Sequence, residues 1–439
     1  MEKNISKIEP FEICSIRPPT ENYSLTFRLT RNCGWNKCLF CPVYKLGAKF
    51  SRRSIDDVKK DVDRASAINS LLTDIELDGF YSRGNAIFEM AAQLISKIKQ
   101  AHKEDQVQPV NEQASDKDAS YLSSDCNYQE DERLKWFATW FKEVPTIEDS
   151  VNHVLSWRIS GGQTCFLGDA NSLLLPPDYL TEVIQYIKNT FPTLERFTVY
   201  GRTRSAAKKK PEDMIAFRKA GLHRIHFGVE SGSDTVLSFM KKGVTAEEHI
   251  EGCRKTKDAG ISCSIYVMPG LGGMKWSEEH ALETARVISE SGPDFVRLRS
   301  LEIFPKTGLS LAKAEGNFIE ATEEQIAREL RLLIENIRCS TIIVSDSASN
   351  LLDLNGTLPV DREKILDTID EYLALTPREK LIFSFSSRFH SFMGQYGGIS
   401  HDLLNVLYPY ISGGTIDISS APNNEITNII HLIRSKLMP

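Results

Sequence analysis

From residue 160 onward, short apolar runs alternate with amphipathic helical patterns, and this rhythm constrains the fold more than any other feature of the chain. Glycines such as Gly221 and Gly292 stand where the helices between the runs should end. A repeated strand–helix pattern is typical of a parallel sheet with helical crossovers. Together with an earlier run, the predicted strands cover residues 24–30, 164–169, 196–201, 224–230, 261–268 and 294–303.

Six strand–helix units fall short of the eight in a closed barrel. The sequence therefore predicts an α/β fold in which residues 24–310 form a partial (β/α)6, TIM-like barrel after an N-terminal lead-in at residues 1–23. A polar stretch at about residues 103–133 lacks apolar periodicity and predicts an insertion after the first strand. Residues 311–439 carry amphipathic patterns, so we expect a mainly helical C-terminal extension over one end of the barrel.

Three of the nine cysteines lie together directly after the first predicted strand. Cys33, Cys38 and Cys41 form a C-x4-C-x2-C pattern, and the next cysteine is Cys126. A structural zinc site needs four ligands, and a plant-type ferredoxin with this spacing needs a fourth cysteine. Neither a cysteine nor a histidine follows within reach, because the next histidine is His102. The pattern therefore favours an iron–sulfur cluster with one iron open to a small molecule. The alternative, three thiols that bind no metal, is less favoured.

The cysteine loop, LTRNCGWNKCLFCPVYK, resembles that of the radical S-adenosylmethionine (radical SAM) superfamily. The similar subgroup has four residues between the first two cysteines and an aromatic residue, here Phe40, before the last. The likeness continues in the superfamily's order through FLGDANSLLLPPDYL, RIHFGVESGSDTVLSFMKKGVT, YVMPGLGG and PDFVRLRSLEIFPKTGL, over roughly residues 12–310. It extends to coproporphyrinogen-oxidase-like and methylthiotransferase-like barrels of the superfamily.

The resemblance implies two cofactors. Cys33, Cys38 and Cys41 would hold one 4Fe-4S cluster, and the methionyl amine and carboxylate of SAM would bind its fourth iron. The implied chemistry is reductive cleavage of SAM to a 5′-deoxyadenosyl radical, which abstracts hydrogen from a substrate. An electron donor such as flavodoxin or ferredoxin is the partner that this chemistry implies.

The remaining candidates lie at the predicted carboxyl ends of strands, where such barrels gather their functional side chains. By resemblance, Gly168 and Asp169 correspond to a motif for the SAM amine, although the sequence has Gly-Asp in place of Gly-Gly-Glu; a helix N-cap is the alternative for Asp169. Glu230 resembles a contact to the SAM ribose or amine, with a structural tie to a neighbouring loop as the alternative.

Three further residues, together with Phe40, complete the set of candidate cofactor-binding residues. Arg202 is expected either to bind a carboxylate of SAM or substrate as a fork, or to lie on an exposed loop. Gly270 belongs to a turn that resembles the superfamily's glycine-rich turn near the adenine, or is an ordinary turn. Arg297, like Arg299, is expected to point into the barrel as a ligand, or to be an ion-paired structural arginine.

The composition mainly excludes classes of function. The net charge is −6, so the charge balance gives no indication of nucleic-acid binding. No secretory signal and no run of eighteen apolar residues is visible, so we expect a cytoplasmic location and no membrane segment. The substrate, a small molecule or another species, is not indicated. Two alternatives stay open: a non-catalytic iron–sulfur or zinc protein on an inherited barrel, and a coproporphyrinogen-oxidase-like oxidoreductase.

Overall fold

The computed structural model describes residues 5–14, 16–45, 49–72, 80–105 and 145–437. Its core is an eight-stranded sheet. The strand order is β1-β4-β5-β6-β7-β8-β9-β10, and neighbours are parallel except for β9 with β10. The sheet is open, since β1 and β10 are its edges. The strands are β1 (Leu25–Arg28), β4 (Thr164–Gly168), β5 (Arg196–Gly201), β6 (Leu222–Glu230), β7 (Ser262–Val267), β8 (Phe295–Leu298), β9 (Thr341–Val344) and β10 (Gly356–Leu358).

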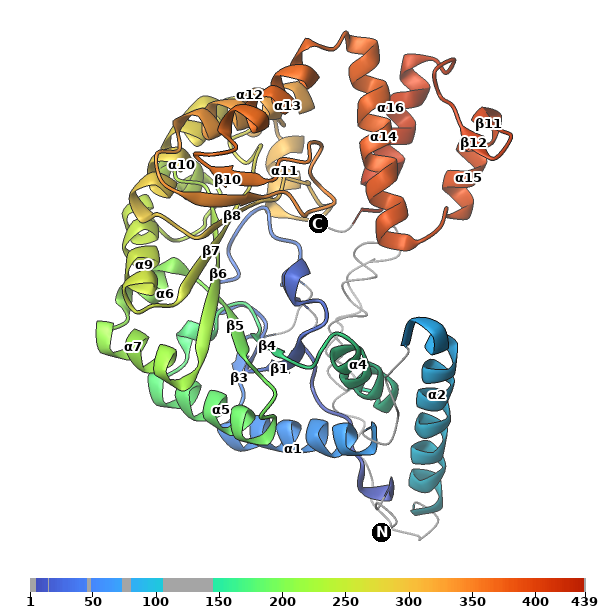
Figure 1. The fold of residues 1–439 in the computed structure, drawn as a ribbon. Coiled ribbons are helices and arrows are strands. Elements are labelled where there is room, and N and C mark those ends of the chain that lie inside the picture. Colours follow the sequence, from blue (N-terminus) through green and yellow to red (C-terminus); the bar gives the residue numbers. More distant parts are fainter. Residues whose placement is uncertain (1–4, 15, 46–48, 73–79, 106–144, 438–439) are drawn as a thin grey trace.

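The helices of this part of the chain lie mainly along the outside of the curved sheet (Figure 1). They are α1 (Ile55–Leu72), α2 (Phe80–Asp105), α4 (Ile147–Ile159), α5 (Pro177–Thr190), α6 (Thr203–Lys208), α7 (Pro211–Ala220), α8 (Asp234–Phe239), α9 (Ala246–Asp258), α10 (Ser277–Ser291), α11 (Gly308–Ala314), α12 (Glu323–Asn336) and α13 (Arg362–Ala374). The ends follow local chemistry: Thr245 and Glu248 form the capping box of α9, and Gly292 ends α10 in the left-handed conformation. Among the described helices, none has the length and hydropathy that a bilayer span requires.

All six predicted strands are present, and the predicted α/β barrel-like class is confirmed. The sheet continues beyond residue 310, where we expected mainly helices: β9 pairs parallel with β8, and β10 pairs antiparallel with β9. The apolar segment of β9 is four residues long. A run of this length is too short to show the alternation of apolar and polar residues that marks a strand. Its pairing with β8 is what makes it a strand.

The excursion between β1 and β4 carries the cysteine loop. β2 (Thr30–Arg31) and β3 (Ser51–Arg52) pair antiparallel and close the base of that loop. Helix α1 follows β3 directly and leads away from the loop. Residues 106–133 of the predicted insertion, with Cys126, lie outside the described residues.

The buried apolar side chains of the described residues fall into distinct groups. The largest lies between the sheet and its helices. A second belongs to the C-terminal elements α14 (Pro377–Tyr396), α15 (His401–Leu407), β11 (Ile411–Ser412), β12 (Thr415–Ile416) and α16 (Asn423–Arg434). A third packs Phe40 of the cysteine loop against Met240, Leu301 and Leu309. The cysteine loop therefore has an apolar support of its own.

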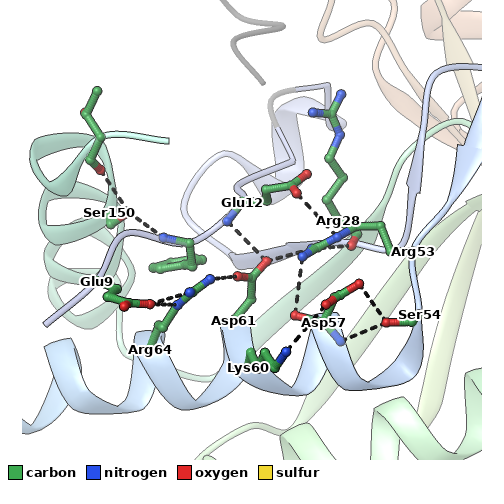
Figure 2. A network of polar contacts seen from close by, with 12 residues as sticks. Glu9, Glu12, Arg28, Arg53, Ser54, Asp57, Lys60, Asp61, Arg64 and Ser150 are labelled. Atoms are coloured by element: carbon green, nitrogen blue, oxygen red, sulfur yellow. Dashed lines mark hydrogen bonds and ion pairs between the residues drawn. The ribbon is translucent and has the colours of Figure 1, made fainter. Parts of the chain in front are cut away.

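A network of charged side chains fixes the N-terminal segment on α1 (Figure 2). Asp61 is 1% exposed, and its Oδ2 accepts hydrogen bonds from Nη1 of Arg53 (2.6 Å) and from the backbone N–H of Glu12 (3.2 Å). Nη1 of Arg53 also donates to the carbonyl of Arg28 at the end of β1 (3.0 Å). Because β1 leads directly into the cysteine loop, this network fixes the base of the loop.

Candidate functional site

A cavity of about 210 Å³ lies at the carboxyl ends of β5, β6, β7 and β8, under the cysteine loop. The loop contributes Cys33, Cys38, Phe40 and Cys41 to its lining. The strands and the turns after them contribute, among others, Tyr200, Arg202, Glu230, Lys242, Tyr266, Met268 and Arg299. The structure thus gathers around one cavity six of the ten site residues that the sequence predicts: the three cysteines, Phe40, Arg202 and Glu230.

The start of the cysteine loop is bent by two asparagines with left-handed backbone, Asn32 (φ 66°) and Asn36 (φ 43°). Asparagine tolerates this region better than most residues. Oδ1 of Asn32 accepts a hydrogen bond from the N–H of Cys33 (2.6 Å), and the N–H of Asn36 donates to Sγ of Cys33 (3.5 Å). The first cysteine is therefore oriented by its own loop.

Trp35 docks the loop onto the turn after α8. Its indole N–H donates to the carbonyl of Lys241 (2.8 Å). Its ring packs against Gly243, which has φ +67°, and a Cβ at this position would lie 2.0 Å from the ring. The Arg202 guanidinium lies 4.9 Å from the ring centroid and donates to the carbonyls of Lys242 and Gly243. In this structure Arg202 therefore holds the loop in place, and burial lowers its pKa.

Glu230 ends β6 with a left-handed backbone (φ 67°) and forms a buried ion pair. Its Oε1 accepts from Nζ of Lys242 at 3.0 Å, while Oε2 has no hydrogen bond to any described residue. Burial disfavours the charge on Lys242, yet the nearby Glu230 and Cys38 together raise its pKa. Gly228 makes room for the pair, since a Cβ there would lie 2.3 Å from Oε1 of Glu230. The result is a carboxylate on the cavity wall with one oxygen held by Lys242.

Asp169 lies behind the cavity wall and does not line it. Its carboxylate is 1% exposed, and Oδ2 accepts from Nε (3.1 Å) and Nη2 (3.0 Å) of Arg28 and from the N–H of Asn32 (3.1 Å). Gly168 packs against Cys14, with no room for a Cβ. Burial raises the pKa of Asp169, although Arg28 acts in the opposite direction. The contacts of Gly168 and Asp169 thus brace the cysteine loop, because Arg28 occupies the carboxylate that we expected to face SAM.

Gly270 and Arg297 also lie outside the cavity lining. The N–H of Gly270 donates to Oε1 of Glu329 (2.7 Å), a buried residue of α12 whose Oε2 accepts from Ser277 (2.6 Å). Arg297 is 2% exposed and forms an ion pair with Asp346. Its contacts match the alternative of an ion-paired structural arginine.

Several residues that line the cavity were not predicted from the sequence. Tyr200 and Tyr266 lie in predicted strands, and their alternation with core residues was a usable signal for the inward face. Lys242 had no such signal, because its pairing with Glu230 depends on how the turn after α8 folds back over β6.

The three cysteines of the loop line the cavity together. Among the described residues, no three His, Cys, Asp or Glu side chains converge as a single metal ion requires. A 4Fe-4S cluster takes each thiolate on a different iron, so its ligands are spread around a larger centre. Burial raises the pKa of Cys38 and raises that of Cys41 to about 11, so ligation has to displace thiol protons.

Comparison with known proteins shows which proteins this chain resembles. The sequence model of the radical SAM superfamily matches residues 126–285. A tRNA uridine(34) acetyltransferase of Methanocaldococcus jannaschii is 36% identical over 55 residues, which are 12% of this chain and 10% of that protein. A tRNA-2-methylthio-N(6)-dimethylallyladenosine synthase of Chromohalobacter salexigens is 30% identical over 123 residues, 28% of this chain and 26% of that protein. The chain thus matches only a small part of each relative's length.

Solved structures with a weak overall similarity to this chain include radical SAM enzymes. The methyltransferase TsrM from Kitasatospora setae, with cobalamin and a [4Fe-4S] cluster bound, is 14% identical, with a TM-score of 0.39 over 72% of this chain and 43% of that one. Coproporphyrinogen III oxidase (HemN) from Escherichia coli is 13% identical, with a TM-score of 0.31 over 63% of this chain and 78% of that one. Enzymes of the superfamily bind a 4Fe-4S cluster and SAM, the two predicted cofactors. Residues 126–285 therefore match a radical SAM domain, in agreement with the resemblance of the cysteine loop, which itself lies outside this match.

Proposed function

We propose that this protein is a radical SAM enzyme that binds one 4Fe-4S cluster through Cys33, Cys38 and Cys41 and binds SAM in the adjoining cavity. One observation carries the proposal: the three thiols and the Glu230 carboxylate line the same cavity at the carboxyl ends of the strands. When bound and reduced, the cofactors supply a 5′-deoxyadenosyl radical for hydrogen abstraction from a small-molecule substrate. A reducing protein such as flavodoxin or ferredoxin is the electron donor that this chemistry requires.

The side chains of the cavity bind and orient SAM. Oε2 of Glu230 is free to accept a hydrogen bond from the SAM amine or a ribose hydroxyl, while Oε1 is held by Lys242. Phe40, Met268 and Phe304 supply apolar surface that keeps water from the reacting atoms.

Residues behind the cavity position the cysteine loop. The Trp35–Arg202 contact holds one side of the loop, and the Arg28–Asp169 pair holds its base. We assign positioning roles to these four residues, because their described contacts are to the protein itself.

The test removes one ligand and keeps the fold. Cys38→Ala should lose the iron and acid-labile sulfide of the cluster, whereas Cys339→Ala, at a thiol outside the cavity, should retain both. After anaerobic reduction with dithionite and addition of SAM, wild type and Cys339→Ala should release 5′-deoxyadenosine and Cys38→Ala should not. If the wild-type protein carries its cluster and bound SAM but releases none, it is a non-catalytic iron–sulfur protein and the proposal is wrong.

A further inference from the structure

A second, larger cavity of about 860 Å³ adjoins the first. The side chains common to both linings are Ile16, Val43, Tyr200, Tyr266 and Arg299. The opposite wall is formed by the loop at residues 345–353 and by helix α14. A cavity of this size is in the range that encloses an organic ligand, and it lies directly beside the proposed cofactor cavity.

Two arginines in this lining, Arg17 and Arg299, form no ion pair with a described carboxylate. The side chain of Arg299 is half-buried and makes no hydrogen bond or ion pair within the part of the chain that the structure describes. The side chain of Arg17 donates to the carbonyl of Cys14 (3.4 Å) and pairs with no described carboxylate. An arginine in such surroundings is suited to a carboxylate or phosphate, which its planar fork binds through two hydrogen bonds.

The carboxylates of the same lining do not neutralise these arginines. Asp346 is already paired with the buried Arg297. Asp353 is exposed and accepts a hydrogen bond from the side-chain amide of Asn355. Neither arginine therefore forms an ion pair with a described carboxylate, although the buried Glu21 acts on the charge of Arg17.

A tyrosine hydroxyl adds a further polar group. Tyr266 is 8% exposed, and its buried hydroxyl has no hydrogen-bond partner among the described residues. Buried hydroxyls are nearly always hydrogen-bonded, so a bound polar group would satisfy this one. The rings of Tyr200 and Tyr266 flank His226, with centroid distances to it of 6.2 and 6.3 Å, and form an aromatic surface between the two cavities.

We propose that the second cavity binds an organic substrate by its oxyanion, a carboxylate or a phosphate, which Arg299 and Arg17 hold and to which Tyr266 donates a hydrogen bond. This assignment of a substrate class rests on the proposed function. Leu351, Leu352 and Phe383 of the opposite wall contact the organic part of the molecule. Because Arg299 lines both cavities, an anion held there anchors the substrate beside SAM.

The test uses three probes that each carry a single phenyl ring: benzoate, phenyl phosphate and uncharged benzamide. Their affinities for the cluster-loaded, full-length protein are measured by ligand-detected NMR. We expect one of the oxyanions to bind at least about tenfold more tightly than benzamide, and its identity distinguishes a carboxylate from a phosphate substrate. Arg299→Gln should weaken that binding at least about tenfold, and Arg17→Gln should weaken it as well. Arg328→Gln, at an exposed arginine on α12, should leave it unchanged.

SAM affinity measured on the same samples separates this inference from the proposed function. It should be unchanged in Arg299→Gln; a parallel loss would make Arg299 a ligand of SAM and overturn the assignment. Equal binding of benzamide and the oxyanions would also overturn it, as would unaltered oxyanion binding by both glutamine variants. Arg299→Lys keeps the charge, so partial recovery of binding shows that the loss in Arg299→Gln is not misfolding. If wild type binds the oxyanion but not SAM, the cofactor proposal fails while the anion site stands.

Discussion

At the scale of single residues, the cavity is organised by buried charges that occur in pairs. Glu230 pairs with Lys242 on the cavity wall, and Asp169 pairs with Arg28 behind it. A buried pair adds little net stability, because desolvation opposes the attraction, but losing one partner leaves an uncompensated charge. Such pairs therefore fix where a loop lies more than they stabilise the fold.

Asp169 gives the sharpest test at this scale. Asp169→Ala should lower the free energy of unfolding by about 3–5 kcal/mol, because Arg28 is left charged and buried without its carboxylate. Asp169→Asn retains an acceptor for the N–H of Asn32 and should be less damaging. Denaturant unfolding measures both, with Asp178→Ala at an exposed aspartate as the control, expected within about 1 kcal/mol of wild type. Equal values for Asp169→Ala and the control would contradict the bracing role.

At the scale of elements, buried polar contacts join neighbouring units. Ser231, after β6, shares a hydrogen bond with Nδ1 of His280 on α10 (2.8 Å), and His280 Nε2 contacts the carbonyl of Met268 (3.1 Å). His249 on α9 shares a 2.7 Å hydrogen bond with Thr203 of α6. These contacts fix the turns after β5, β6 and β7, which carry the cavity residues.

His249 predicts a pH dependence of folding. It is fully buried, and burial, with the charges of Lys242 and Arg202, lowers its pKa to about 3. The unfolded chain takes up this proton at a higher pH, near 6.5, than the folded protein does. Stability should therefore fall as the pH drops from about 6.5 towards 3, at about 1.4 kcal/mol per pH unit for this one proton.

Denaturant unfolding at a series of pH values checks this expectation. His249→Asn keeps a hydrogen-bonding group for Thr203 but takes up no proton, so its stability should depend less steeply on pH in the acid range. A slope identical to that of wild type would show that His249 does not set the acid sensitivity.

At the scale of the whole molecule, the open sheet is completed by the C-terminal elements. The loop after β9 and helix α14 supply one wall of the second cavity. Arg434 of α16 donates from Nε and Nη2 to the two carboxylate oxygens of Glu302, both at 3.1 Å, and Glu302 lines the first cavity. This bidentate pair links the C-terminal helices to the barrel.

Loss of this link should loosen the C-terminal helices. Arg434→Ala should lower stability by about 2 kcal/mol, because the nearly buried Glu302 loses its charged partner. Amide hydrogen exchange should become faster in α16 and leave β6 and β7 unchanged. Arg331→Ala, which removes exposed ion pairs to Glu335 and Asp370 away from α16, is the matched control. Unaltered exchange in α16 would mean that its apolar contacts alone hold it to the barrel.

The sequence by itself determined the features that have a local signal. Apolar runs bounded by turn residues located the six strands, and the spacing of Cys33, Cys38 and Cys41 identified the loop that faces the cavity. Glu230 lies at the end of β6, as predicted, because a strand's end is readable from its period.

Only the tertiary structure decided which partners those residues meet. Asp169 faces Arg28, 141 positions away, and so braces the loop, while Arg297 is occupied by Asp346 and Arg299 lines both cavities. The addition of β9 and β10 to the sheet was decided in the same way. Periodicity records which face of an element is buried, but the charge of a residue's neighbour depends on segments that are brought together only by folding.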